Sequence, residues 1–330
     1  PFFLAVNKVD SASHHFILPE FSKLGLENTF AVSAEHGNGL YELIEAMAKS
    51  LPEPEPESDS DCDDIRIAVI GKPNVGKSSL INSLLKSERC IVSDVPGTTR
   101  DAIDTFLEWN GRRFILIDTA GIRRKGKTHQ VLDKFSVIMA LKALDRCDVA
   151  VLVLDSAQQV SDQDATVAGY AIDRGKACLI LGNKWDLSGE KEISFDEFED
   201  HVRYKLKFLE FAPVVTVSAK TGLRIDKILP QVEKIYQEYS RRIPTATLNE
   251  CFERAIQKNP MSSYRGKFMK LFYATQVKKQ PPTFKCFLNF PEGIHFSYRR
   301  YLINSLRKRF GFYGTPVRLI LSGKRKGIDS

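Results

Sequence analysis

The sequence predicts an α/β fold with a mostly parallel sheet, followed by a smaller α+β domain. Short apolar runs such as residues 65–70 and 177–181 end in polar motifs, which is typical of buried parallel strands. The first of these runs leads through a glycine-rich segment into residues 80–85, where apolar side chains recur at helical spacing. Charge then divides the chain, because residues 1–240 hold 29 Lys and Arg against 37 Asp and Glu, whereas residues 241–330 hold 19 against 4. The C-terminal part is therefore expected to be a separate basic domain.

The glycine-rich segment matches a phosphate-binding loop. Residues 71–78 read GKPNVGKS, which fits GxxxxGKS between a predicted strand and a predicted helix. In such a loop, backbone N–H groups surround the phosphates, Lys77 reaches the β- and γ-phosphates, and the Ser78 hydroxyl coordinates Mg²⁺. A structural turn without a nucleotide is the weaker interpretation, because further nucleotide motifs follow downstream.

Those motifs come in the order that GTP binding requires. Asp118-Thr119-Ala120-Gly121 follows the predicted strand at 114–117, so that Asp118 holds Mg²⁺ through water and the Gly121 N–H meets the γ-phosphate. Asn183-Lys184-Trp185-Asp186 indicates guanine, because its carboxylate accepts both N–H donors of the guanine edge and would be left unpaired by adenine. Ser218-Ala219-Lys220 follows the predicted strand at 214–217 and closes over the base.

A threonine-containing segment lies between the phosphate loop and Asp118. Residues 96–101 read PGTTRD, and a threonine there can complete the Mg²⁺ shell when GTP is bound. We expect Thr99 to be the ligand, with Thr98 as the alternative. The predicted GTP contacts are Gly71, Lys72, Pro73, Asn74, Val75, Gly76, Lys77, Ser78, Asp118, Thr119, Ala120, Gly121, Ile122, Asn183, Lys184, Trp185, Asp186, Ser218 and Ala219.

A second copy of the guanine motif stands near the start of the chain. Asn7-Lys8-Val9-Asp10 follows the apolar run at 2–6, and Ser33-Ala34 follows a second apolar segment, but no phosphate loop precedes them. Taken alone, a turn of these residues after a strand explains the tetrapeptide equally well. Its likeness to Asn183–Asp186 favours guanine contacts of a first nucleotide domain that is represented only in part.

With these motifs, the chain resembles the Der (EngA) family of bacterial double-GTPase ribosome-assembly factors. The resemblance rests on the loop at 71–78, the segment GTTRD at 97–101, the motif NKWD at 183–186, and PPTF at 281–284 with YRRYL at 298–302. It implies GTP and GDP binding with Mg²⁺, GTP hydrolysis, and assistance to assembly of the large ribosomal subunit through contact with its RNA.

The resemblance also implies a division into four segments. We expect a remnant of a first GTPase domain at 1–50, an acidic linker at 51–64, a complete P-loop GTPase domain at 65–240 and a basic KH-like domain at 241–330. In the linker, alternating Pro and Glu stiffen the chain while like charges repel. Because the chain opens on Pro1 and lacks the first phosphate loop, we interpret it as N-terminally incomplete.

The position that follows Gly121 raises a question about catalysis. Many GTPases place Gln there to orient the attacking water, whereas this chain has Ile122. The resemblance suggests that Asn74 helps to hold a K⁺ ion beside the phosphates, where it supplies positive charge. We therefore expect slow, K⁺-stimulated hydrolysis. The alternative is that Asn74 only accommodates a tight loop conformation.

The C-terminal segment is expected to follow the order helix, strand, strand, helix, strand, at residues 248–258, 267–277, 283–290, 298–310 and 317–321. This order resembles the KH-like domain of the family. Gly311-Phe312-Tyr313-Gly314 falls between a helix and a strand, so we interpret it as a turn and not as an RNA-binding GxxG loop. Tyr301 and Phe310 are expected in the core, although they and Tyr298 and Phe312 could instead stack on bases. The candidate RNA contacts are Arg299, Arg300, Arg307, Lys308, Arg309, Lys324, Arg325 and Lys326.

Composition excludes several other classes of protein. No apolar run approaches the roughly 20 residues of a membrane span. The six cysteines form no CxxC pair, so we expect reduced thiols and a cytoplasmic location. We also expect a monomer. Two alternatives to ribosome assembly stay open, namely a GTPase that acts on tRNA or another RNA, and an RNA-binding scaffold with an inert GTPase.

Overall fold

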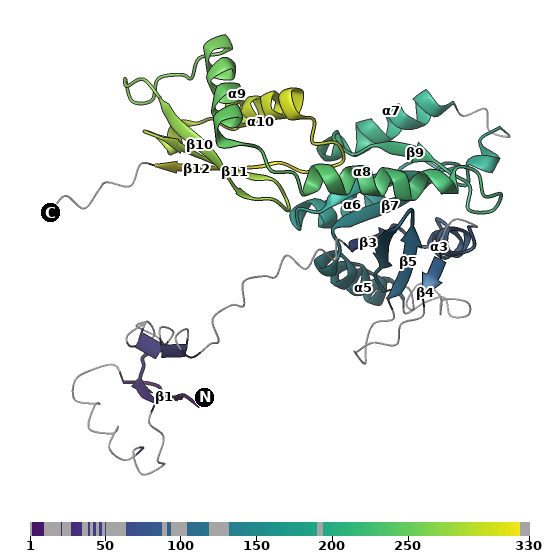
Figure 1. The fold of residues 1–330 in the computed structure, drawn as a ribbon, viewed down its shortest axis with the longest axis horizontal. Helices are drawn as coiled ribbons and strands as arrows, with labels where there is room; N and C mark the ends of the chain where they lie inside the picture. Colours follow the sequence, from purple (N-terminus) through teal and green to yellow (C-terminus); the bar gives the residue numbers. More distant parts are fainter. Residues whose placement is uncertain are drawn as a thin grey trace. The chain divides into compact units, whose positions relative to one another are not determined.

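The computed structural model describes residues 2–9, 21, 28–34, 39, 42–43, 46–47, 50, 64–87, 91–93, 104–118, 132–189 and 194–323 (Figure 1). The chain divides into two compact units, residues 1–62 and 63–330. In the first unit, β1 (Leu4–Val6) and β2 (Thr29–Ala31) pair in parallel. Val6, Val9 and Val32 are buried beside this pair.

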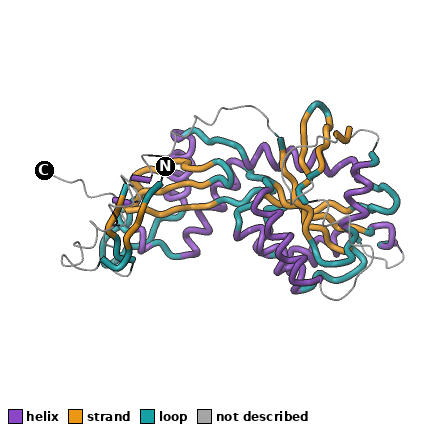
Figure 2. The backbone as a smooth tube through the Cα atoms, turned by 90° about the horizontal axis from the view of Figure 1, so that it is seen from below, coloured by secondary structure: helices purple, strands orange, loops and turns teal. Residues whose placement is uncertain are grey.

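The second unit begins with a seven-stranded sheet in the order β4-β5-β6-β3-β7-β8-β9. Figure 2 draws the strands of this unit in orange among the helices in purple. Its strands are β3 (Ile65–Ile70), β4 (Ile91–Ser93), β5 (Thr105–Trp109), β6 (Arg112–Leu116), β7 (Val149–Asp155), β8 (Ala177–Asn183) and β9 (Val214–Thr216). Strands β3, β6, β7, β8 and β9 are parallel to one another. Strand β5 is antiparallel to both of its neighbours, β4 and β6. Every residue of β7 and β8 is buried, because helices cover both faces. The predicted α/β class with a mostly parallel sheet is confirmed.

Helices pack on the two faces of this sheet in separate apolar cores. On one face lie α3 (Lys77–Leu85) and α8 (Ile228–Tyr239). On the other lie α5 (Leu132–Arg146), α6 (Asp162–Asp173) and α7 (Phe195–Lys205). Short 3₁₀ turns complete the domain as η2 (Trp185–Leu187), η4 (Lys207–Leu209) and η5 (Ile225–Lys227). Because strands β3, β6, β7, β8 and β9 are parallel, their carboxyl ends lie at the same edge of the sheet. The loop residues that follow these strands converge there.

The basic C-terminal domain has the predicted element order. It consists of α9 (Thr245–Lys258), β10 (Leu271–Lys278), β11 (Thr283–Leu288), η6 (Pro291–Gly293), α10 (Phe296–Phe310) and β12 (Arg318–Gly323). The sheet order is β10-β11-β12, and α9 and α10 lie over one of its faces (Figure 1). Residues 311–314 form a turn after α10, as predicted, and Phe312 is fully buried in the core beneath it. Tyr301 and Phe310 also pack against that core, so their predicted placement is confirmed.

A dense joint connects the two domains of the second unit. The turn after α10 is inserted between them, because Cys178 N donates to Gly314 O at 2.7 Å and Gly314 N donates to Phe211 O at 2.9 Å. Gly314 has φ +65°, and a Cβ there would lie 2.5 Å from Ile235 Cγ1, so the contact requires glycine. Within the part of the chain described, no helix is both long enough and apolar enough to cross a membrane.

Candidate guanine-nucleotide site

The phosphate loop joins β3 to α3, and its conformation depends on its glycines. Gly71 has φ +148°, and a Cβ there would lie 2.4 Å from Val153 O. Gly76 has φ +95°, and its Cβ would lie 2.3 Å from Asn183 Nδ2. Asn74 is also left-handed, with φ 63°, a conformation that asparagine adopts more readily than most residues. The GxxxxGKS spacing therefore fixes a loop that approaches β7 and β8 closely.

Lys77 stands at the first position of α3, with its ammonium group folded back over the loop. Its Nζ donates to Gly71 O at 2.7 Å and to Lys72 O at 2.6 Å. Both acceptors are neutral backbone carbonyls of the loop itself. Phosphate would therefore compete with them for the ammonium group, and charged acceptors make the stronger hydrogen bond.

Asn183 connects three motifs that are distant in sequence. Its Nδ2 donates to Val75 O in the phosphate loop at 2.8 Å, and its Oδ1 accepts from Ala219 N at 3.0 Å. The side chain is buried, so both bonds are shielded from water. Asp186 is positioned separately, because its Oδ1 accepts a 2.6 Å hydrogen bond from Ser218 Oγ. The structure thus brings the predicted phosphate and guanine motifs together at one edge of the sheet.

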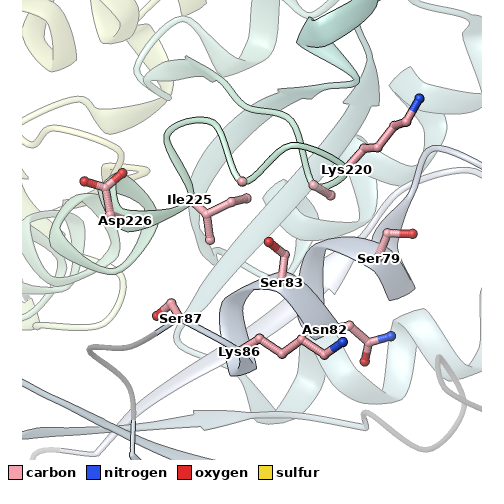
Figure 3. A pocket seen from close by; sticks show the side chains of 10 residues that line it. Ser79, Asn82, Ser83, Lys86, Ser87, Lys220, Ile225 and Asp226 are labelled. Atoms are coloured by element: carbon pink, nitrogen blue, oxygen red, sulfur yellow. The ribbon is translucent and has the colours of Figure 1, made fainter.

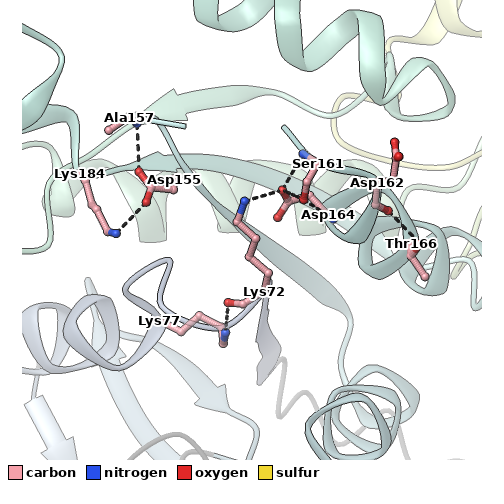
Figure 4. A network of polar contacts seen from close by, with 9 residues as sticks. All are labelled: Lys72, Lys77, Asp155, Ala157, Ser161, Asp162, Asp164, Thr166 and Lys184. Carbon is pink, nitrogen blue, oxygen red and sulfur yellow. Dashed lines mark hydrogen bonds and ion pairs between the residues drawn. The ribbon is translucent and has the colours of Figure 1, made fainter. Parts of the chain in front are cut away.

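Lys184 and Trp185 take different places within the same motif. Lys184 is left-handed, with φ 64°, and its Nζ forms an ion pair with Asp155 Oδ2 at 2.7 Å (Figure 4). Trp185 packs its ring edge-on against Phe198, with centroids 5.8 Å apart, in the core beneath α7. The Trp185 side chain therefore packs in the apolar core and supports the guanine motif through this packing.

Three acidic residues that no motif indicates support these loops. Asp155 holds Lys184, and Asp164, at the start of α6, forms an ion pair with Lys72 at 3.1 Å. Asp104 accepts from the backbone N–H of Asp118 at 3.1 Å. Each contact spans a long sequence separation, so no local pattern could have found it.

An open cavity lies beside the guanine motif. It has a volume of about 760 Å³, within the usual range for small-ligand sites. The lining residues come from α3 and the two residues that follow it, and from the segment after β9 (Figure 3). The lining residues are Ser79, Asn82, Ser83, Lys86, Ser87, Ala219, Lys220, Gly222, Ile225 and Asp226. Ala219 belongs both to this cavity and to the Asn183 bridge, which places the cavity next to the predicted base position.

The first copy of the motif repeats the same backbone geometry. Asn7 Oδ1 accepts from Ala34 N at 3.0 Å, as Asn183 Oδ1 does from Ala219 N. Lys8 has φ 68°, close to the 64° of Lys184. Asn7 and Lys8 therefore repeat the geometry of Asn183 and Lys184, although the first unit has no phosphate loop among its described residues.

Several predicted contacts lie outside the described residues. These are Asp10, Thr99, Thr119, Ala120, Gly121, Ile122, Lys324, Arg325 and Lys326. Ser78 and Asp118 are both described, Ser78 in the first turn of α3 and Asp118 two residues after the end of β6, with φ 55°.

The predicted RNA contacts on α10 differ in their surroundings. Arg307 donates to Phe312 O at 3.1 Å and Thr315 O at 2.8 Å, and its guanidinium lies 4.7 Å from the Phe211 ring centroid. Burial lowers the pKa of Arg307 to about 10. By contrast, Lys308 and Arg309 are exposed. Arg307 therefore stabilises the joint between the KH-like domain and the GTPase domain through these contacts.

Two further arginines on α10 also have protein partners. Arg299 donates to Leu319 O at 2.6 Å, and Arg300 forms an exposed ion pair with Glu210 at 3.4 Å. The Arg299 bond fastens α10 to β12. An exposed ion pair such as Arg300–Glu210 contributes little to stability, so this guanidinium can exchange partners.

Comparison with known proteins identifies both domains of the second unit. The family described as "50S ribosome-binding GTPase" matches residues 66–184, and the family described as "KH-domain-like of EngA bacterial GTPase enzymes, C-terminal" matches residues 242–321. GTPase Der of Geotalea daltonii is 44% identical over 98% of this chain and 73% of that protein. GTPase Der of Desulforapulum autotrophicum is 48% identical over 100% of this chain and 69% of that protein.

The solved structures are more distant. The chain resembles Era in complex with MgGDPNP and a segment of 16S ribosomal RNA at 23% identity and a TM-score of 0.39, over 78% of this chain and 92% of that chain. At this level the likeness carries no functional implication.

Proposed function

This chain belongs to the GTPase Der family, and from that premise we propose that it is a switch in which GTP controls docking of the basic KH-like domain on RNA of the large ribosomal subunit. GTP and GDP binding with Mg²⁺, and hydrolysis of GTP, follow from membership of the family. The large subunit, the slow rate of turnover, the cytoplasmic location and the monomeric state belong to the proposal.

One observation supports the proposed switch. Strand β8 contacts both the nucleotide site and the turn that anchors the KH-like domain. Its last residue is Asn183, which bridges the phosphate loop and the Ala219 segment. Near its other end, Cys178 N donates to Gly314 O in the turn that anchors the KH-like domain. A displacement at the base-binding end would be transmitted along a strand that is buried throughout. This supports coupling between nucleotide state and the position of the basic domain.

Mg²⁺ fits the donors that the chain offers beside the phosphate loop. We propose Ser78 and Thr99 as protein ligands, with Asp118 acting through water. Hydroxyl and carboxylate oxygens are the ligands that this cation prefers, and the bound ion neutralises charge on the phosphates. The backbone N–H of Asp118 donates to Asp104 Oδ1 at 3.1 Å, which holds the backbone at Asp118 in place.

We also propose that hydrolysis is K⁺-stimulated, with Asn74 as a ligand of the ion. The left-handed backbone at Asn74 suits the loop, and the exposed Asn74 side chain carries an amide oxygen that can act as a ligand. Turnover should be faster in K⁺ than in Na⁺ at equal ionic strength. Asn74→Gly keeps the backbone conformation and should remove the difference between the two ions. Equal rates for the unaltered protein in both salts would refute this part of the proposal.

The main test is co-sedimentation of the full chain with purified large ribosomal subunits. A non-hydrolysable GTP analogue is compared with GDP at one fixed salt concentration, because binding to phosphate backbones depends steeply on salt. Selective pelleting with the GTP analogue supports the switch. Equal pelleting in both states contradicts it and favours an RNA-binding scaffold, whereas absence of pelleting directs the search to tRNA and other RNAs.

Lys77→Ala separates the enzyme from the scaffold. Removal of the ammonium group should abolish GTP hydrolysis, because Lys77 is the cation expected at the β- and γ-phosphates. If nucleotide-dependent pelleting is lost in the same variant, docking follows nucleotide occupancy. Equal pelleting with the GTP analogue and with GDP, in the variant and in the unaltered protein alike, would contradict the switch.

A further inference from the structure

We infer that the helix-free face of the KH-like sheet is a stacking surface for unpaired RNA bases; this rests on the proposed function and names a site within it. The sheet has α9 and α10 over one face, and no described helix lies over the other (Figure 1). Side chains alternate between the two faces of a strand. Because Ala274, Cys286 and Leu319 are buried in the core, their neighbours along β10, β11 and β12 lie on the open face.

Two aromatic rings stand together on this open face. Tyr273 of β10 and Phe287 of β11 are cross-strand partners, with ring centroids 4.4 Å apart and ring planes 16° apart. Tyr273 lies on an edge strand and is 48% exposed, so its ring is stacked on Phe287 and is otherwise open to solvent. Bases stack on such rings whatever their sequence, because every base has a π-face.

The surroundings of the pair are apolar and basic. Lys285 Nζ lies 5.1 Å from the Phe287 ring centroid, and Ile320, the neighbour of Leu319 on β12, is 45% exposed on the same face. Outside α10, residues 261–323 contain seven Lys and Arg and a single acidic residue, Glu292. A protein partner with an apolar surface would need only the apolar side chains of this face and not its positive charge. The excess of positive charge around an exposed aromatic pair favours a polyanion with flat apolar rings, which is single-stranded RNA.

Arg318 places the open face next to the domain joint. Its guanidinium donates to Asp173 O at 3.0 Å, and its contact with Gly175 is close enough that a Cβ there would lie 2.9 Å from Nη2. The stacking surface therefore begins where the KH-like domain is fastened to the GTPase domain. RNA on this face would lie along β10 and β11, on the opposite side of the sheet from α10 and its basic residues.

The test measures binding of the full chain to a labelled oligouridine single strand and to an RNA duplex of the same length. Tyr273→Ala should weaken single-strand binding about tenfold, the usual effect of removing one stacking ring, and leave duplex binding unchanged. Tyr273→Phe keeps the ring and should bind as the unaltered protein does. Retained binding by Tyr273→Phe distinguishes a lost stacking contact from damage to the fold.

Tyr204 provides a matched control on the GTPase domain. It is 67% exposed on α7, and Lys207 Nζ lies 4.9 Å from its ring centroid, so it offers the same chemistry outside the basic domain. Tyr204→Ala should bind both RNAs normally. The inference is overturned if Tyr273→Ala binds the single strand normally, or if it loses single strand and duplex alike. Docking on the large subunit would still stand in either case, provided that co-sedimentation of the unaltered chain is GTP-selective.

Discussion

Asp164 and Lys72 form an ion pair that fastens the phosphate loop to the start of α6. The two side chains are 3.1 Å apart, and they are only 1% and 15% exposed, respectively (Figure 4). Asp164 Oδ2 also accepts from Ser161 N at 2.9 Å and from Ser161 Oγ at 2.7 Å, so one carboxylate serves both a capping box and the loop. The position of the loop thus depends on a residue outside all the nucleotide motifs.

Asp164→Asn tests this support. The amide retains the shape and can still accept from Ser161, but it leaves the Lys72 ammonium without its counter-ion. Loss of one member of a buried pair costs about 3 kcal/mol, and we expect a decrease in unfolding free energy of that order together with weaker GDP binding. Chemical denaturation and nucleotide titration measure the two effects.

Asp162→Asn is the matched control for that variant. It makes the same change in the same helical turn, but the Asp162 side chain is 96% exposed and pairs with Lys205 at the surface. Its effect on stability should stay within about 0.5 kcal/mol. Equal effects of the two substitutions would mean that the charge at the helix start matters, and not the link to Lys72.

Asp186→Asn tests the assignment of the base. An amide at this position can donate to a carbonyl where guanine carries its amino group, so xanthine nucleotides should gain affinity as guanine nucleotides lose about a hundredfold. The Asn oxygen can still accept from Ser218 Oγ, which keeps the loop in place. Competition against a fluorescent nucleotide measures both affinities.

Ser218→Ala provides the comparison for Asp186→Asn. It removes the 2.6 Å bond to Asp186 without changing the group that meets the base, so both nucleotides should weaken alike. If Asp186→Asn behaves in this same way, the carboxylate holds the loop and does not select the base.

The sequence predicts the strands and the motifs better than the joint between the domains. Strands β7 and β8 are continuous apolar runs, and the glycines of the phosphate loop occupy conformations that few other residues adopt, so local pattern is sufficient for both. The joint has no such signal. Gly314 contacts Cys178, Phe211 and Ile235, which are distant in sequence, and only the folded chain brings them together.

The run Arg307-Lys308-Arg309 shows the limit of a charge pattern. In sequence the three residues are equivalent candidates for RNA contact. On a helix with 3.6 residues per turn, neighbours point in different directions, so Arg307 faces Phe211 and the turn at 311–315, whereas Lys308 and Arg309 face solvent. Charge counting could not separate the inward residue from the outward ones.

Arg307→Ala and Lys308→Ala should therefore affect different properties, namely stability and RNA binding. Arg307→Ala removes two charged hydrogen bonds and a cation–π contact at the joint, which should lower the unfolding free energy by about 2 kcal/mol. Lys308→Ala should leave stability unchanged and weaken RNA binding with a smaller salt slope. Thermal unfolding and salt-dependent RNA titration separate them, and a stability loss in Lys308→Ala would contradict the placement.

Asp148 provides a pH-dependent prediction at the base of the GTPase sheet. Its Oδ2 accepts from Arg66 N at 2.9 Å, and burial raises the pKa of Asp148, although Arg66 and Lys176 act in the opposite direction. A raised folded-state pKa means that the native state prefers the protonated carboxyl. The contribution to stability is therefore present below the ordinary carboxyl pKa and is lost as pH rises through the raised value.

Asp148→Asn removes this titration while keeping an oxygen that can accept from Arg66 N. The variant should match the unaltered protein at acidic pH and become more stable than it above the raised pKa, as measured by chemical denaturation across a pH series. Asp145→Asn serves as the control, since Asp145 is 61% exposed and pairs with Arg174 at the surface. It should show no such divergence with pH. A difference between Asp148→Asn and the unaltered protein that is constant across pH would mean that the amide alters packing, and that Asp148 does not titrate during unfolding.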